Sequence, residues 1–96
     1  MNYKNGVKVN GVKPEMVLAI MMVNTVIPGA TITSVIDGKH SRTSLHYVGY
    51  AIDVRTRDIK PKMQTEYVRQ LKEALTDEYD VILESDHIHI EFQPKG

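Results

Sequence analysis

Residues 84–92 read ESDHIHIEF, and polar and apolar side chains alternate from His87 onward. Successive side chains of a β-strand point to opposite faces, so a strand here has one polar and one apolar face. The polar face would hold His87, His89 and Glu91, and the apolar face Ile88, Ile90 and Phe92. We therefore expect a strand whose apolar face packs into the core and whose polar face looks into a cleft.

A second stretch, residues 40–53, reads HSRTSLHYVGYAID and contains the other two of the four histidines. The chain has no cysteine, so its metal ligands are limited to imidazole and carboxylate, a set that suits zinc. If the end of this stretch is extended, Gly49, Ala51 and Asp53 share one face, and the two small residues leave room for an ion and a substrate. His46 lies an odd number of residues before Gly49, so on a continuous strand it would point to the opposite face. We therefore expect His46 on a turn before the strand. The two stretches together predict a metal site.

The sequence SLHYVGYAID at 44–53 resembles the SxHxxGxAxD signature of the D-alanyl-D-alanine peptidase superfamily. That superfamily includes D,D-carboxypeptidases and dipeptidases, phage L-alanyl-D-glutamate endolysins and the signalling domain of hedgehog proteins. The longer run 38–54 is most similar to the hedgehog version, and the closing HIH at 87–89 resembles the region of the superfamily's last metal ligand. The resemblance extends over residues 31–92.

The resemblance implies that His46, Asp53 and His89 are the metal ligands. Three protein ligands leave the fourth position of zinc open for water, which distinguishes a catalytic site from a closed structural one. Zinc lowers the pKa of its bound water to about 7, so hydroxide is available near neutrality. The expected cofactor is therefore Zn²⁺.

Hydrolysis also needs a group that takes a proton from the water and returns it to the leaving amine. Asp86 lies three residues before His89, where much of the superfamily has its catalytic acid, usually a glutamate. Glu84 is the alternative, because the hedgehog pattern places its comparable glutamate further upstream. His87 shares a face with His89 and, by resemblance, stabilises the oxyanion of the tetrahedral intermediate. A supporting or surface histidine is the alternative for His87.

Two residues of the first stretch are expected to meet the substrate. His40 matches a histidine that hedgehog-like members keep before the first ligand, and the resemblance places it in the cleft. Ser44 belongs to the signature and holds either the loop or the substrate's carboxylate. Arg55 and Arg57 are interpreted as surface charges, and Glu91 as a strand-edge polar residue with a supporting role behind a ligand as the alternative.

The function implied by the resemblance is a zinc-dependent peptidase that hydrolyses D,D or L,D bonds in peptidoglycan stem peptides, as in a carboxypeptidase or a phage endolysin. The partner would be the peptidoglycan peptide itself. Hedgehog domains keep the zinc site yet act by binding partners, so a zinc-stabilised binding module is the alternative. A carboxylate placed to reach the zinc-bound water would favour the enzyme over the module.

Length, charge and hydrophobicity bear on the number of domains, the partners and the location of the protein. A chain of 96 residues predicts one domain, favoured as a monomer, and a bound metal would help to stabilise its small core. The formal net charge is zero, which does not favour nucleic acid or an anionic membrane as partner. The apolar run 16–27 is too short to span a bilayer, and a buried helix is favoured there over a secretory signal. We expect synthesis in the cytoplasm and action on the cell wall.

The expected fold is α+β, a small antiparallel sheet with two helices on one face, as in the superfamily. The segment 31–36 is rich in β-branched residues and predicts a strand. Further strands are predicted at 50–55, 79–83 and 87–92. The last two should form a hairpin. Helices are predicted from Pro14 through the apolar run and over 63–75, where apolar residues recur at helical spacing. Residues 1–12 predict a turn or a short strand.

Overall fold

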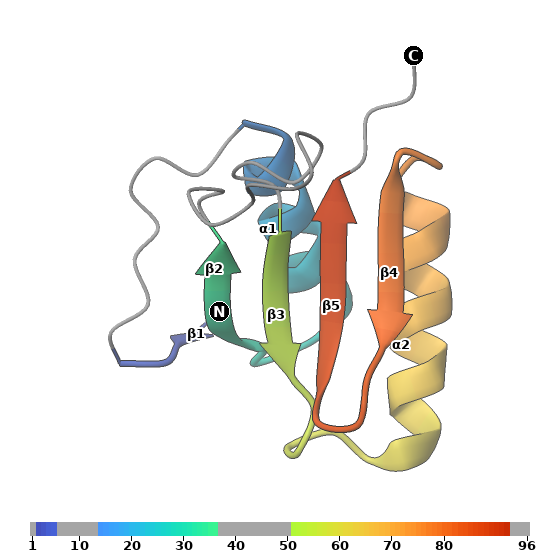
Figure 1. The fold of residues 1–96 in the computed structure, drawn as a ribbon. Helices are drawn as coiled ribbons and strands as arrows, with labels where there is room; N and C mark the ends of the chain where they lie inside the picture. Colours follow the sequence, from blue (N-terminus) through green and yellow to red (C-terminus); the bar gives the residue numbers. More distant parts are fainter. Residues whose placement is uncertain (1, 6–13, 37–50, 93–96) are drawn as a thin grey trace.

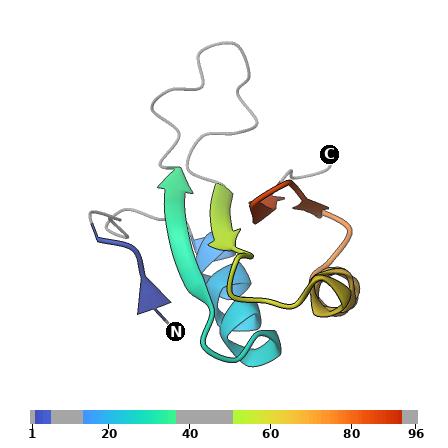
Figure 2. The same ribbon diagram turned by 90° about the horizontal axis from the view of Figure 1, so that it is seen from below.

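The structure is a computed structural model that describes residues 2–5, 14–36 and 51–92. Its elements follow in the order β1 (Asn2–Tyr3), α1 (Pro14–Val26), β2 (Thr31–Ile36), β3 (Ala51–Arg55), α2 (Pro61–Ala74), β4 (Tyr79–Leu83) and β5 (His87–Phe92). The strands form one sheet in the order β1-β2-β3-β5-β4, and both helices lie on the same side of it (Figure 1, Figure 2). The predicted combination of a sheet with two helices on one face is confirmed.

One strand pair departs from the predicted antiparallel sheet. β1 runs parallel to β2, whereas the pairs β2–β3, β3–β5 and β5–β4 are antiparallel. Parallel neighbours need a crossover connection, and α1 lies between these two strands in the chain. The backbone N–H of Lys4 donates to the carbonyl of Ile32 at 2.8 Å, which holds the end of this short strand at the edge of β2.

Prolines set the start of both helices. α1 begins at Pro14, as predicted, and α2 begins at Pro61 rather than at residue 63. Proline suits the first helical position, because its fixed φ is helical and its missing N–H would have no partner there. After α1, Gly29 has a φ of +67°, a left-handed conformation that favours glycine. The chain can therefore turn directly from α1 into β2.

The core lies between the sheet and the helices. α1 contributes Met16, Ala19 and Val23, which are fully buried at helical spacing, so the predicted helix packs one face into the core. Its other face leaves Val17, Leu18 and Met21 exposed. α2 contributes Leu71, and the residue after its end, Leu75, is also buried, whereas Ala74 is exposed. Among the described residues no helix has the length and hydrophobicity needed to cross a membrane.

β4 and β5 form the predicted hairpin. The backbone N–H of Glu84 donates to the carbonyl of His87 at 2.8 Å and closes the turn. Tyr79 of β4 packs its ring against Phe92 of β5, with centroids 5.0 Å apart, and its hydroxyl donates to the carbonyl of Glu15 in α1 at 2.7 Å. The hairpin is thereby fixed to the first helix, and the opposite face of the sheet is left for the polar side chains.

Candidate metal centre

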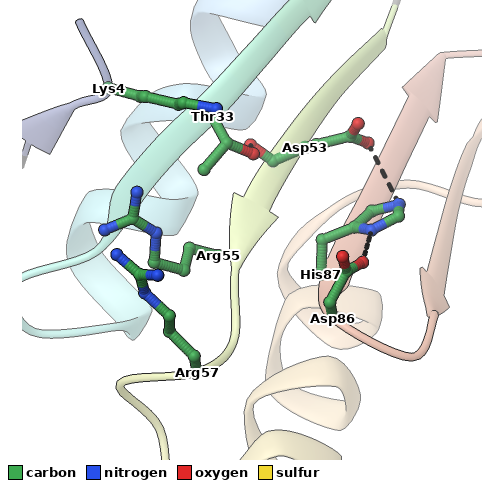
Figure 3. A pocket seen from close by; sticks show the side chains of 7 residues that line it. All are labelled: Lys4, Thr33, Asp53, Arg55, Arg57, Asp86 and His87. Carbon is green, nitrogen blue, oxygen red and sulfur yellow. Dashed lines mark hydrogen bonds and ion pairs between the residues drawn. The ribbon is translucent and has the colours of Figure 1, made fainter.

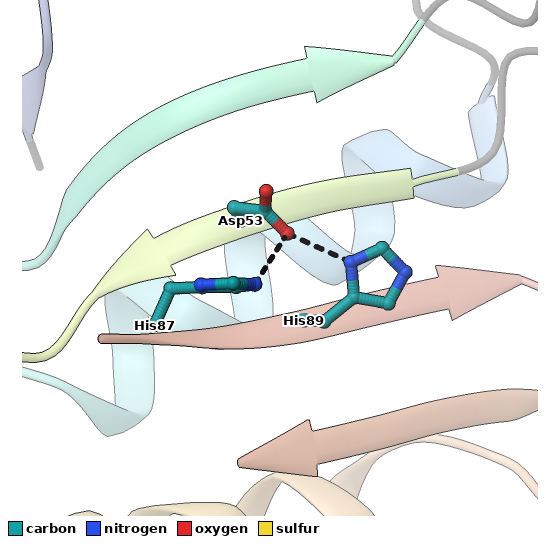
Figure 4. A group of neighbouring side chains, drawn as sticks. All are labelled: Asp53, His87 and His89. Carbon is teal, nitrogen blue, oxygen red and sulfur yellow. Dashed lines mark hydrogen bonds and ion pairs between the residues drawn. The ribbon is translucent and has the colours of Figure 1, made fainter. Parts of the chain in front are cut away.

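The polar residues of β3 and β5 meet because of the register between the two strands. Asp53 lies directly opposite His89 in the antiparallel pair, and Arg55 lies opposite His87. Side chains that face each other across such a pair have Cβ atoms about 5 Å apart. His87 and His89 are two residues apart on β5, so both project from the face that carries Asp53 (Figure 4).

The three side chains are close enough to share one ion. His89 Nδ1 donates to Asp53 Oδ1 at 2.7 Å, and His87 Nε2 lies 3.6 Å from the same oxygen. One donor atom from each of Asp53, His87 and His89 can be chosen so that all lie within 4.8 Å of one another. The side chains are 20–30% exposed, so the group is accessible from solvent yet partly enclosed.

Each imidazole has a second carboxylate on its other nitrogen. His87 donates from Nδ1 to Asp86 Oδ1 at 2.6 Å, and His89 has Nε2 2.9 Å from Glu91 Oε1. Carboxylates in this position orient metal-binding histidines, fix the tautomer and increase the basicity of the ligand nitrogen. The pattern of one nitrogen toward Asp53 and the other toward an outer carboxylate is common to both histidines.

The carboxylates also change the protonation of the group. The hydrogen bond to Asp53 is the main cause that raises the pKa of His89 to about 9, with Glu91 adding to the effect and burial opposing it. The hydrogen bond from His87 lowers the pKa of Asp86 below its ordinary value. Without a metal, His89 is therefore protonated at neutral pH, and a cation at this position would take the place of that proton.

The donor set fits a zinc ion. Zinc binds imidazole nitrogen and carboxylate oxygen, usually with four ligands, and catalytic sites supply three from the protein. Asp53, His87 and His89 offer two nitrogens and one oxygen from two adjacent strands, with supporting carboxylates already in contact. Asp53 and His89 were predicted as ligands, whereas His87 was predicted as the oxyanion donor.

The other predicted residues have different placements. His46, predicted as a ligand, and His40 and Ser44, predicted to meet the substrate, lie outside the described residues. Asp86, the predicted proton-transfer group, is 83% exposed at the hairpin turn and reaches the site through His87. Its alternative, Glu84, is exposed at the same turn.

A pocket of about 390 Å³ lies on the polar face of the sheet, where the sequence predicted a cleft (Figure 3). Arg55 and Arg57, interpreted from the sequence as surface charges, belong to its lining. Asp53, Asp86 and His87 line it together with Thr33, Lys4, Arg55 and Arg57. Strand alternation could have indicated part of this set, because Arg55 follows Asp53 by two residues on β3. Thr33 lies at an irregularity in the β2–β3 pairing, and its hydroxyl donates to the carbonyl of Asp53 at 3.4 Å.

Comparisons of the chain with family models, with curated proteins and with solved structures give no match.

Proposed function

We propose that this protein is a zinc-dependent peptidase that hydrolyses peptide bonds in peptidoglycan stem peptides. The observation that carries the proposal is the convergence of Asp53, His87 and His89 on one face of the sheet, beside an open pocket. The signature at 44–53 adds the reaction class, because it resembles that of peptidases acting on such substrates. The geometry supports a metal site, and the resemblance supports peptide hydrolysis at it.

Two residues are assigned to the metal on both grounds. Asp53 and His89 face each other across β3 and β5, with His89 Nδ1 2.7 Å from Asp53 Oδ1. Both belong to the ligand set that the resemblance implies. The third ligand is His46 by resemblance, with His87 as the alternative that the described geometry offers. A bound zinc ion would polarise the scissile carbonyl and make hydroxide available near neutral pH.

The remaining chemistry is assigned to the pair Asp86 and His87. Asp86 accepts a hydrogen bond from Nδ1 of His87, which leaves Nε2 directed toward Asp53 and the site. As an imidazolium, with a proton on each ring nitrogen, His87 can donate from Nδ1 to Asp86 and from Nε2 to the carbonyl oxygen of the substrate as negative charge develops there. Proton transfer by Asp86 to the leaving amine would pass through the same imidazole or through a water molecule at the pocket.

The test is release of new amino groups from purified peptidoglycan by the full chain with zinc present. Wild type is compared with Asp86→Ala and Glu84→Ala, and metal content is measured on all three samples. We expect activity in the wild type and its loss in Asp86→Ala at a zinc concentration high enough to keep one ion bound per chain in both. Loss in Glu84→Ala alone would move the proton-transfer role to Glu84.

The same samples test the alternative function. A wild type that holds one zinc ion per chain and releases no amino groups would contradict the peptidase. It would favour the zinc-stabilised binding module, the alternative that the hedgehog-like run at 38–54 suggests.

A further inference from the structure

The pocket beside the candidate metal ligands Asp53, His87 and His89 has two walls of opposite charge. Asp53, Asp86 and His87 form one wall, and Lys4, Arg55 and Arg57 supply the cations of the other. Figure 3 shows the guanidinium groups of Arg55 and Arg57 on the same side of the pocket, across from His87 and Asp86, with Lys4 extending in from the edge of the sheet. A ligand lying across this pocket would meet the two walls with its two ends.

The cationic wall has the properties of an anion-binding surface. Within the described ranges 2–5, 14–36 and 51–92, no carboxylate forms an ion pair with Arg55, Arg57 or Lys4. Like charges held on one side of a pocket repel each other, and an anion between them removes that repulsion. Arginine binds carboxylate through two parallel N–H groups, which fixes direction as well as charge.

We propose that Arg55 and Arg57, assisted by Lys4, bind the C-terminal carboxylate of the substrate, so that the protein removes a terminal amino acid and acts as a carboxypeptidase. This assignment rests on the proposed peptidase function and specifies its substrate class. The acidic wall disfavours a polyanion, because Asp53 and Asp86 line the same pocket. A single carboxylate at the end of a peptide would place its negative charge against the arginines and not against Asp53 or Asp86.

The spacing along β3 suits a carboxylate one residue beyond the cleaved bond. Asp53 and Arg55 are two residues apart on a strand, which separates their Cα atoms by about 6.6 Å. Consecutive residues of a peptide are about 3.8 Å apart, and an extended arginine side chain covers the remaining distance. A scissile carbonyl beside Asp53 and His87 therefore leaves the next carboxylate within reach of Arg55, and Arg57 lines the same side of the pocket. An endopeptidase would need the chain to continue through this wall.

The experiment compares two peptides that differ in one group. An acetylated peptide ending in D-alanyl-D-alanine is offered as the free acid and as the C-terminal amide to the zinc-loaded full chain. We expect the wild type to prefer the free acid, and Arg55→Gln and Arg57→Gln each to raise its KM about 10–100-fold with a smaller change in kcat. The amide should be insensitive to both substitutions. Lys62→Gln removes an exposed cation of α2 outside the pocket and is the matched control.

Binding keeps this test independent of the proposed activity. If the wild type cleaves neither peptide, both are titrated calorimetrically into the same zinc-loaded samples. Tighter binding of the free acid that is lost in Arg55→Gln and Arg57→Gln would support the carboxylate subsite while the peptidase assignment fails. Equal binding or equal cleavage of acid and amide by the wild type would overturn the subsite. A free-acid preference that survives both substitutions would also overturn it.

Discussion

The two faces of β5 differ in what holds their side chains in place. On the inner face, Ile88 and Ile90 are fully buried and Phe92 nearly so, packed against the helices and the neighbouring strands. On the open face, His87, His89 and Glu91 are partly exposed and are held by hydrogen bonds. His89 bonds to Asp53 and to Glu91, and His87 bonds to Asp86. The inner face is fixed by hydrophobic burial, whereas the open face is a set of charges that compensate each other and can be rearranged by a cation.

The largest effect on folding is expected from the inner face. Ile90→Ala removes three carbon atoms from a fully buried position opposite Ile52 and Val81. We expect the free energy of unfolding, measured by urea denaturation, to fall by about 2–5 kcal/mol because of lost burial and the cavity that remains. Ile90→Val should cost about 0.5–1.5 kcal/mol. A cost for Ile90→Ala below that of the valine variant would contradict the account of the inner face.

The outer carboxylates should matter for metal binding more than for folding. Asp86→Asn and Glu91→Gln keep the shape of the side chain but weaken the support of His87 and His89. We expect each to reduce zinc affinity about 10–100-fold, measured by competition with a chromogenic chelator. Asp58→Asn, which removes an exposed carboxylate away from the site, is the control. Unchanged affinity in both variants would show that these carboxylates do not support the metal ligands.

The open face should also give the stability of the metal-free protein a characteristic pH dependence. The pKa of His89 is raised from 6.5 to about 9 by Asp53 and Glu91, so protonated His89 stabilises the fold. Its contribution is fully present below pH 6.5 and is lost as the pH rises through about 9. Urea denaturation in the presence of a chelator should therefore show stability declining over this range.

Saturating zinc should reverse that trend, because binding requires His89 to lose its proton and is favoured at higher pH. A metal-free protein whose stability is constant or rises between pH 6.5 and 9 would contradict the protonated His89. The same scan on His89→Gln should lack the decline and serves as the control.

The smallest effect is expected at an isoleucine of the open face. Ile82 lies opposite His89 and is 46% exposed, in contrast to the fully buried Ile90. Ile82→Thr keeps the β-branched shape and should change the free energy of unfolding by no more than about 0.5 kcal/mol. A loss comparable to that of Ile90→Ala would mean that the open face is covered and packed like the inner one.

The contrast between the faces also explains what could be predicted from the sequence. The alternation from His87 to Phe92 sets which side chains of β5 are buried, because period two is a local property of a strand. The β1–β2 pairing was not predictable, since a strand of two residues carries no period. The start of α2 was predicted two residues late because the apolar spacing was weighed above the proline at 61, a signal present in the sequence.

The candidate site was predictable only in part, for a related reason. The resemblance at 44–53 indicated Asp53, and the closing HIH indicated His89. That His87 also approaches Asp53 depends on the register between β3 and β5, which no local pattern reports. Arg55 and Arg57 lie across the pocket from His87, and this position depends on the path of the chain at the end of β3 and on the adjoining hairpin turn. The two segments are joined there by the N–H of Thr56, which donates to the carbonyl of Asp86 at 3.3 Å.

The metal centre is tested by a calorimetric titration of zinc into the metal-free full chain, with Asp53→Asn and His89→Ala titrated in parallel. We expect one zinc ion per wild-type chain, with proton release at neutral pH, and no saturable binding in either variant. Parallel titrations of His46→Ala and His87→Ala would identify the third ligand. A wild type that binds no zinc, or an Asp53→Asn variant that binds it as tightly as the wild type, would contradict the metal centre.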